Sequence, residues 1–175
     1  MHTVTALLDR PTVVTTDELS TAYRAHHQRA VRLAYLLCSD REMAEDAVAN
    51  VWLKVHRRMG RGPIDDVGAY VRRAVVNEVN SGFRRLGLMR REMSRRRGDD
   101  RGQRGHEEQV ADSAAMVQAL ARLPERTRTA VVLRYYLDLS VADTAATMGI
   151  SEGTVKSSVS RGLEQLRAYL EEGQP

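Results

Sequence analysis

Cysteine, large aromatic residues and long apolar runs are scarce in this chain of 175 residues, and each scarcity excludes a class of protein. Cys38 is the only cysteine, so no disulfide can form within the chain, which agrees with a reducing cytoplasm. No apolar run approaches the roughly 18 residues of a membrane span, and the N-terminus lacks the basic and then apolar order of a signal peptide. We therefore expect a cytoplasmic protein without a membrane span.

Motifs of catalysis are also missing. The sequence has no HExxH pair, no glycine-rich phosphate loop, no nucleophile elbow and no carboxylates clustered at metal-ligand spacing. The adjacent His26 and His27 would point about 100° apart on a helix, so they cannot easily share one metal ion. We expect no enzyme activity, no metal and no cofactor. A nuclease is the catalytic alternative, which a divalent-ion-dependent DNA cleavage assay would reveal.

Positive charge is abundant, and it is concentrated in the middle of the chain. The formal net charge is +4, but residues 52–104 hold 15 Lys and Arg against 6 Asp and Glu, so the flanks are net acidic. Such asymmetry favours a polyanionic partner for the middle segment, with a solvated basic face as the plain alternative.

Helical periodicity runs through almost the whole sequence, and it predicts an all-α protein. Residues 87–106 interrupt it, because they are rich in Arg, Gly and Asp and poor in large apolar side chains. We predict two small helical domains, at 17–86 and 107–172, joined by this flexible linker. Residues 1–16 lack a helical period and are expected to form a flexible extension.

Local signals predict where several helices begin. Ser39 has the capping-box spacing to start a helix over 39–59, and Asp65 or Asp66 can cap the next one, over 67–86. Pro124 suits the first turn of a later helix. That helix is expected to carry a basic side, formed by Arg126, Arg128 and Arg134.

Residues 140–170 have the pattern of two helices joined by a tight turn. Ser140 can cap the first helix, Gly149 can end it in the left-handed conformation, and Ser151 can cap the second. Small, polar or basic side chains occupy the outward positions near the start of the second helix, as insertion into a major groove requires. These positions are Glu152, Thr154, Lys156, Ser157, Ser160 and Arg161.

The predicted helix over 67–86 mixes Arg with Asn and has only one acidic residue, Glu78, within it. Arg suits phosphates and guanine, and Asn suits adenine or an unstacked base. We therefore expect this helix to bind nucleic acid through Arg72, Arg73, Asn77, Asn80, Arg84 and Arg85.

Three stretches together resemble bacterial RNA polymerase sigma factors of the extracytoplasmic-function (ECF) group. They are RLAYLLCSDREMAEDAVANVWLKVHRR at 32–58, AYVRRAVVNEVNSGFRR at 69–85, and the stretch at 123–167 that begins LPERTRTAVVLRYY. A helix-turn-helix alone is weakly specific, whereas these three stretches in this order are strongly specific. The sequence departs from the family at Ala49-Asn50, where Gln-Glu is common, and at Ser158, where Arg is frequent.

The resemblance implies a promoter-specificity subunit that binds core RNA polymerase, directs transcription initiation and aids strand opening. The first domain would be sigma region 2, which binds the −10 element and, through a loop at 61–66, a base flipped from the non-template single strand. The second domain would be sigma region 4, which reads the duplex −35 element. Region 2 would dock on the polymerase clamp and region 4 on the flap. Members are often held inactive by an anti-sigma factor, although no motif of this chain encodes that partner.

Site residues follow from matching the family pattern to this sequence. The expected −35 contacts are Gly153, Thr154, Lys156, Ser157, Ser160 and Arg161; the −10 contacts are Asp65, Asp66, Arg72, Arg73, Asn77, Asn80, Arg84 and Arg85; the clamp contacts are Asp46, Asn50, Leu53, Lys54 and Arg57.

A stand-alone DNA-binding repressor or activator remains the competing interpretation. It accounts for the second domain but leaves the helices of the first domain without a purpose. Stable association with core polymerase would indicate a sigma factor, whereas unaided binding to duplex operator DNA, usually as a dimer, would indicate a plain regulator.

Overall fold

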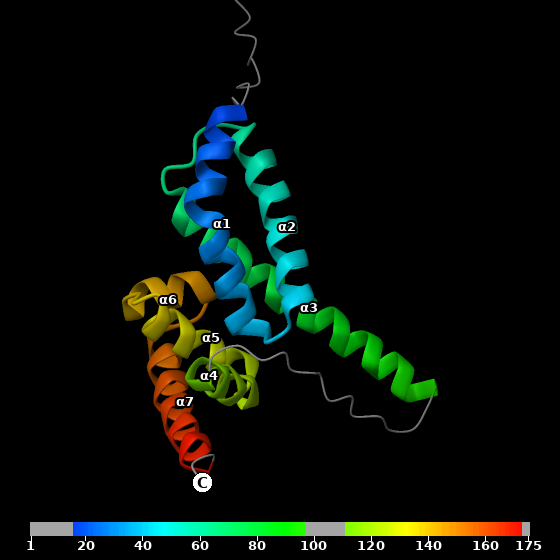
Figure 1. The fold of residues 1–175 in the computed structure, drawn as a ribbon, viewed down its shortest axis with the longest axis vertical. Helices are drawn as coiled ribbons and strands as arrows, with labels where there is room; N and C mark the ends of the chain where they lie inside the picture. The colour runs from blue at the N-terminus through cyan, green and yellow to red at the C-terminus, as the bar shows by residue number, and fades with distance from the viewer. Residues whose placement is uncertain (1–15, 97–110, 173–175) are drawn as a thin grey trace, which may run out of the picture.

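Three long helices form the first unit of the protein, in a computed structural model that describes residues 16–96 and 111–172. They are α1 (Thr16–Cys38), α2 (Arg41–Met59) and α3 (Val67–Arg96), and each packs against the other two (Figure 1). Their core is built mainly from valine, alanine and leucine. Leu33, Val48 and Val75 are each at most 1% exposed, and small β-branched side chains allow close helix packing. Trp52 lies in the same core.

The start of α2 differs from the prediction. Asp40, not Ser39, is the N-cap, and its side chain accepts a hydrogen bond from the backbone N–H of Met43 at 3.0 Å. Ser39 instead takes a left-handed conformation, with φ of 55°, in the turn between α1 and α2. Its hydroxyl therefore cannot reach the first turn of α2. The prediction for α3 is confirmed at Asp66, which accepts from the N–H of Ala69 at 2.8 Å.

Helix α3 is longer than predicted. It continues to Arg96 instead of ending at Leu86, and its C-terminal part projects away from the bundle (Figure 1). The expected linker over 87–106 is thus wrong for its first part, because residues 87–96 are helical. One glycine costs a helix about 1 kcal/mol, and good helix formers such as Leu, Met, Arg and Glu on either side offset it. Thr16, the last residue of the expected extension at 1–16, already belongs to α1. The remainder of that linker and residues 1–15 lie outside the described residues.

The second unit consists of α4 (Ala111–Arg122), α5 (Glu125–Val131), a π-helical turn η1 (Val132–Tyr136), α6 (Val141–Met148) and α7 (Glu152–Glu172). Pro124 is the N-cap of α5. It therefore lies one position before the first turn, for which the sequence predicts it. Helices α5 and α7 cross closely at Gly162. A Cβ atom there would lie only 2.6 Å from Cγ2 of Val131 and 2.8 Å from Cγ2 of Thr127. The two described ranges contain helices and turns and no strand, which confirms the all-α prediction.

The two units pack against each other and share one core. Leu37 and Cys38 at the end of α1 belong to the same buried cluster as Leu120, Leu123 and Leu133 of the second unit. Helix α6 also lies against α3 (Figure 1). None of the described helices is long and apolar enough to cross a membrane.

Arg128 crosses the boundary between the units and contradicts the expected basic side of α5. It is 7% exposed, and its guanidinium donates to the carbonyl oxygens of Leu37 (2.8 Å), Ala121 (2.9 Å) and Leu123 (3.1 Å). These oxygens lie at the ends of α1 and α4, where helical carbonyls lack a partner within the helix. Burial lowers the pKa of Arg128 below its ordinary value but leaves a cation that caps two helix ends.

Candidate nucleic-acid interface

Helices α6 and α7 form the predicted helix-turn-helix, and local side chains fix its turn. The Ser140 hydroxyl accepts from the N–H of Asp143 at 3.0 Å and donates to the carboxylate of the same residue at 2.7 Å. Gly149 ends α6 in the left-handed conformation, with φ of 65°. Ser151 then accepts from the N–H of Thr154 at 3.3 Å at the start of α7. All three predicted signals are confirmed, and together they set the direction in which α7 leaves α6.

The first half of α7 presents one exposed polar face. Val155 and Ser158 on the opposite side are at most 5% exposed and hold the helix against the rest of the unit. Because Ser158 is buried, it contributes no side chain to this exposed face. The six expected −35 residues are all exposed: Gly153, Thr154, Lys156, Ser157, Ser160 and Arg161.

Several of these polar groups already have partners within α7. The Ser157 hydroxyl donates to the carbonyl of Thr154 at 3.1 Å, and Nε of Arg161 donates to the carbonyl of Ser157 at 3.2 Å. The Thr154 hydroxyl lies 2.8 Å from that of Ser151. The Arg161 side chain therefore follows the helix surface toward its N-terminus, which orders the basic group before any ligand binds.

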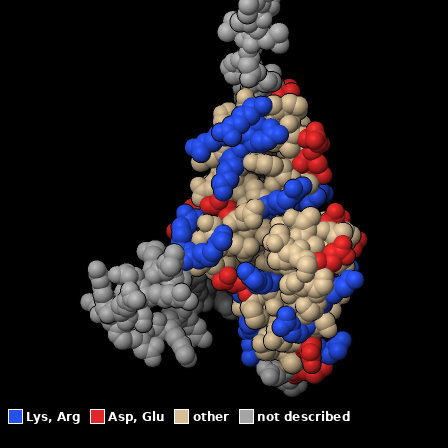
Figure 2. All heavy atoms as spheres, turned by 180° about the vertical axis from the view of Figure 1, so that it is seen from behind, with Lys and Arg blue, Asp and Glu red and all other residues tan. Residues whose placement is uncertain are grey.

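The α3 residues expected to bind nucleic acid lie between Arg72 and Arg85, at different depths. Arg73, Asn77, Arg84 and Arg85 are exposed, whereas Arg72 and Asn80 are half-buried. Lys and Arg side chains gather over the α1–α3 unit on the face that Figure 2 shows. This arrangement combines cations with two amides on a single helix.

The loop before α3 places Asp65 and Asp66 at the helix N-terminus, and both are exposed. The N–H of Ala69, and to a smaller extent nearby Arg72, lower the pKa of Asp66. Asp66 is therefore an ionised acceptor with one oxygen committed to the cap. Any contact it makes with a base is restricted to accepting a hydrogen bond.

The expected clamp residues form one exposed stripe along α2. Asp46, Asn50, Leu53, Lys54 and Arg57 recur at helical spacing, and all five are exposed. Leu53 is the apolar centre of this stripe, with 55% of its surface accessible. Single exposed apolar residues are common on protein surfaces, so the stripe is defined by its helical spacing and exposure and not by Leu53 alone.

Glu78 is a residue of this region to which the sequence assigned no role. It lies on α3 facing α2, is 8% exposed, and forms ion pairs with Lys54 and Arg85. Nδ2 of Asn50 also approaches Oε1 of Glu78 at 3.4 Å. The sequence signal that could have pointed to Glu78 is that it is the one acidic residue within 67–86.

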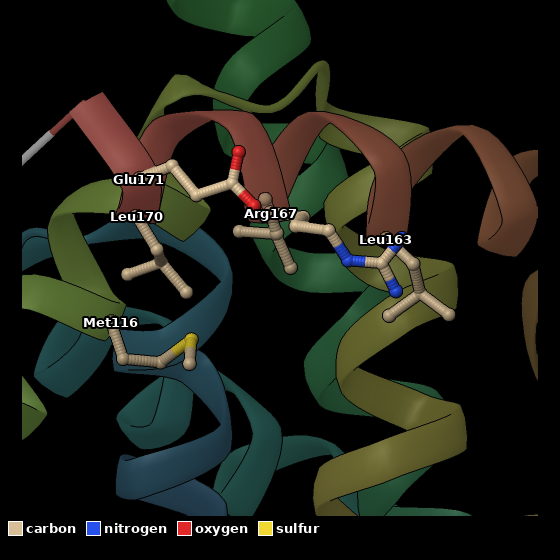
Figure 3. Close-up of a pocket in the computed structure, with 6 residues that line it drawn as sticks. Met116, Leu163, Arg167, Leu170 and Glu171 are labelled. Carbon is tan, nitrogen blue, oxygen red and sulfur yellow. The ribbon is translucent and has the colours of Figure 1, made fainter.

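A shallow apolar groove of about 370 Å³ lies between α4 and the second half of α7. Met116 of α4 lies opposite Leu170 of α7, and Arg167 and Glu171 stand at its rim (Figure 3). Leu163 and Leu166 complete the lining. The groove begins after the last expected −35 residue, so a partner bound there would leave the exposed polar face of α7 open.

His27 and Cys38, the remaining candidates for metal or thiol chemistry, make contacts with their neighbours in the fold. His27 stacks on Tyr23 with ring centroids 4.3 Å apart. Burial raises the pKa of Cys38, whose thiol donates to the carbonyl of Asp40 at 3.1 Å. Within 16–96 and 111–172, no three His, Cys, Asp or Glu side chains gather as a metal site requires.

Comparison with known proteins gives matches in both units. Residues 22–88 match the family described as Sigma-70 region 2, and residues 113–166 match Sigma-70, region 4. The chain is 35% identical over 155 residues to the ECF RNA polymerase sigma factor SigM of Mycobacterium tuberculosis, covering 86% of this chain and 78% of that protein. It is 32% identical over 150 residues to the RNA polymerase sigma-E factor of Streptomyces avermitilis, covering 85% and 82%.

A solved structure has the same fold. The sigma factor RpoE of Bartonella quintana, in complex with the anti-sigma factor NepR, superimposes with a TM-score of 0.68 over 90% of this chain and 97% of that one. The two sequences are 24% identical.

Proposed function

Because the chain belongs to the ECF family of RNA polymerase sigma factors, we propose that its two helical units read the two elements of one promoter. The protein binds core RNA polymerase and directs promoter-specific initiation of transcription. The exposed polar face at the start of α7, held by the caps of a helix-turn-helix, is the observation that carries the proposal for the −35 element.

At the −35 element, the first half of α7 enters the major groove. Lys156 and Arg161 contact phosphates or guanine, and the hydroxyls of Thr154, Ser157 and Ser160 read base edges. Gly153 has no side chain, so the start of α7 can approach the DNA closely. The space that a Cβ would occupy there is open, with Oγ of Ser151 at 4.0 Å as its nearest atom. A good bidentate contact discriminates between bases by about 1–3 kcal/mol.

At the −10 element, α3 and the loop before it hold opened DNA. Arg72, Arg73, Arg84 and Arg85 neutralise phosphates, while Asn77 and Asn80 bind the non-template strand. Asp65 and Asp66 accept hydrogen bonds from a flipped base. Flipping a base costs a few kcal/mol, so several such contacts are needed, and two units provide more of them than one helix-turn-helix.

Docking on the polymerase uses surfaces that leave these DNA contacts open. The α2 stripe centred on Leu53 fits the clamp, and its flanking residues Asp46, Asn50, Lys54 and Arg57 supply polar contacts. We assign the flap contact to the groove between α4 and α7, because it is the apolar surface beside α7 that the expected −35 residues do not use.

The polymerase catalyses nucleotide addition, and this chain contributes binding free energy without an active site or cofactor of its own. It acts in the cytoplasm, where polymerase and promoter are. The relation to a sigma factor solved with NepR adds an anti-sigma factor as a further partner class.

Reconstitution tests the proposal directly. Core polymerase alone and core polymerase with this chain are incubated with genomic fragments, and transcript 5′ ends are mapped. We expect start sites that require the chain and share two upstream elements, together with co-purification of chain and core. Absence of any chain-dependent start site on every genomic template would refute it, and tight dimeric binding to duplex DNA without polymerase would favour a plain regulator.

A further inference from the structure

Glu78 is a buried carboxylate, and a buried charge is unfavourable unless it is paired and hydrogen-bonded. Its side chain is 9% exposed, at the contact between α2 and α3. Three donors surround it. Nζ of Lys54 contacts Oε2, while an Arg85 guanidinium nitrogen (3.3 Å) and the Asn50 amide (3.4 Å) share Oε1.

These three donors belong to two different surfaces of the proposed function. Asn50 and Lys54 are on the α2 stripe assigned to the polymerase clamp, and Arg85 is on the α3 face assigned to −10 DNA. One buried group therefore joins the end of the DNA surface to the polymerase surface. Neither surface can rearrange its side chains at this point without changing the pairing of Glu78.

The charge balance of the cluster leaves Arg85 able to bind a phosphate. Glu78 contributes one negative charge against two positive ones, and Lys54 makes the shorter of the two ion pairs. The Arg85 side chain remains 64% exposed and the Lys54 side chain 49%. Arg85 is thus tethered by one guanidinium nitrogen while its other donors face solvent.

We propose that Glu78 is a positioning residue, which holds Arg85 in the orientation that engages a phosphate of the −10 strand. An untethered arginine on a helix surface samples many rotamers and loses that freedom when it binds. The pairing with Glu78 removes this loss in advance, and Lys54 prevents the carboxylate from cancelling the charge of Arg85. The inference depends on the proposed function, since it deepens the role of one of its DNA contacts.

The test is a mutant cycle in the holoenzyme, with the salt dependence of binding as its measurement. Holoenzymes carrying Glu78→Gln, Arg85→Ala or both changes bind a single-stranded oligonucleotide of the −10 non-template strand. Each phosphate contact on single-stranded DNA contributes about 0.7 to the slope of log K against log salt concentration. We expect each single variant to lower the slope by about 0.7 and the double variant by no more than either one.

Arg84→Ala is the matched control. Arg84 is the exposed neighbour of Arg85 and makes none of the contacts with Glu78 described above. Its loss should add to that of Glu78→Gln, so that the combined variant loses about 1.4 of slope, or two contacts. Thermal unfolding of each variant records stability separately, because a purely structural Glu78 would lower stability and leave the slope unchanged.

The outcomes separate the two hypotheses. If Glu78→Gln leaves the slope unchanged, or if its loss adds to that of Arg85→Ala, the positioning role is wrong. If the wild-type holoenzyme neither binds the oligonucleotide nor initiates at a promoter, the proposed function itself has failed. Should Glu78→Gln not fold, Glu78→Asp replaces it in the same cycle, because it keeps the charge for Lys54 but is one methylene too short to keep both pairs.

Discussion

Replacing Arg128 with alanine should destabilise the protein more than any other substitution of an arginine on α5. The guanidinium makes three hydrogen bonds to backbone carbonyls at 2.8–3.1 Å, and the residue is 7% exposed. A hydrogen bond to a charged group contributes about 1.5–3 kcal/mol. Burying the guanidinium costs several kcal/mol in return, and the variant escapes that cost. The net loss should be about 2–4 kcal/mol.

Urea and thermal unfolding followed by circular dichroism would measure this loss. For a chain of this length, 1 kcal/mol corresponds to about 2–4 °C, so the midpoint should fall by roughly 5–15 °C. Arg126→Ala is the matched control, because Arg126 is exposed on the same helix and should change stability by less than about 0.5 kcal/mol.

Amide hydrogen exchange would show where the effect of Arg128→Ala is felt. Because one of the three carbonyls is that of Leu37 in α1, exchange should accelerate at the end of α1 as well as around α4 and α5. Arg126→Ala should leave both regions protected. If Arg128→Ala matches Arg126→Ala in stability, or if the end of α1 stays fully protected, Arg128 does not join the two units as described.

Three further perturbations test other features. Lys156→Ala and Arg161→Ala should each weaken −35 duplex binding by the holoenzyme and lower the salt slope by about 0.9; unchanged binding would remove α7 from the groove. Gly162→Ala should destabilise by about 1–3 kcal/mol through overpacking, whereas Gly153→Ala, in open space, should not; equal midpoints in denaturation would contradict the close α5–α7 crossing. The raised pKa of Cys38 means that the folded state keeps its proton longer than the unfolded state. Its contribution to stability is therefore complete below the ordinary thiol pKa and declines as pH rises above it. Cys38→Ala should abolish this decline when unfolding is measured between pH 7 and 10, and an unaltered pH profile would contradict this assignment.

The helix-turn-helix could be predicted from sequence because its signals are local. Ser140, Gly149 and Ser151 act on backbone within three or four residues, so their spacing alone carries the geometry. The prediction that Ser39 caps α2 was wrong because two adjacent residues, Ser39 and Asp40, could both cap the helix. Only the left-handed backbone at Ser39, imposed by the turn from α1, decides between them.

Burial of charged groups could not be predicted from the same signals. Arg128 has the spacing of a surface residue, and its interior position depends on how α1 and α5 meet. Glu78 likewise becomes a buried acid only because α2 brings Lys54 beside it. The end of α3 differs from the prediction because the Arg-, Gly- and Asp-rich composition of 87–106 indicates a linker, although residues 87–96 are mostly good helix formers in which a single glycine is a small penalty.

The shared core has a consequence for distance along DNA. A fully compact domain of 175 residues would have a radius of gyration of about 16 Å, or a diameter near 40 Å. The −35 and −10 positions lie about 25 base pairs apart, which at roughly 3.4 Å per pair is about 85 Å of duplex. With Leu37 and Leu123 in one cluster, two proposed reading surfaces in so compact an arrangement would fall short of that length. If α7 and α3 engage both elements of one promoter as proposed, we expect the contact between Arg128 and the carbonyl of Leu37 to open, so that the promoter-bound protein is longer than the free one.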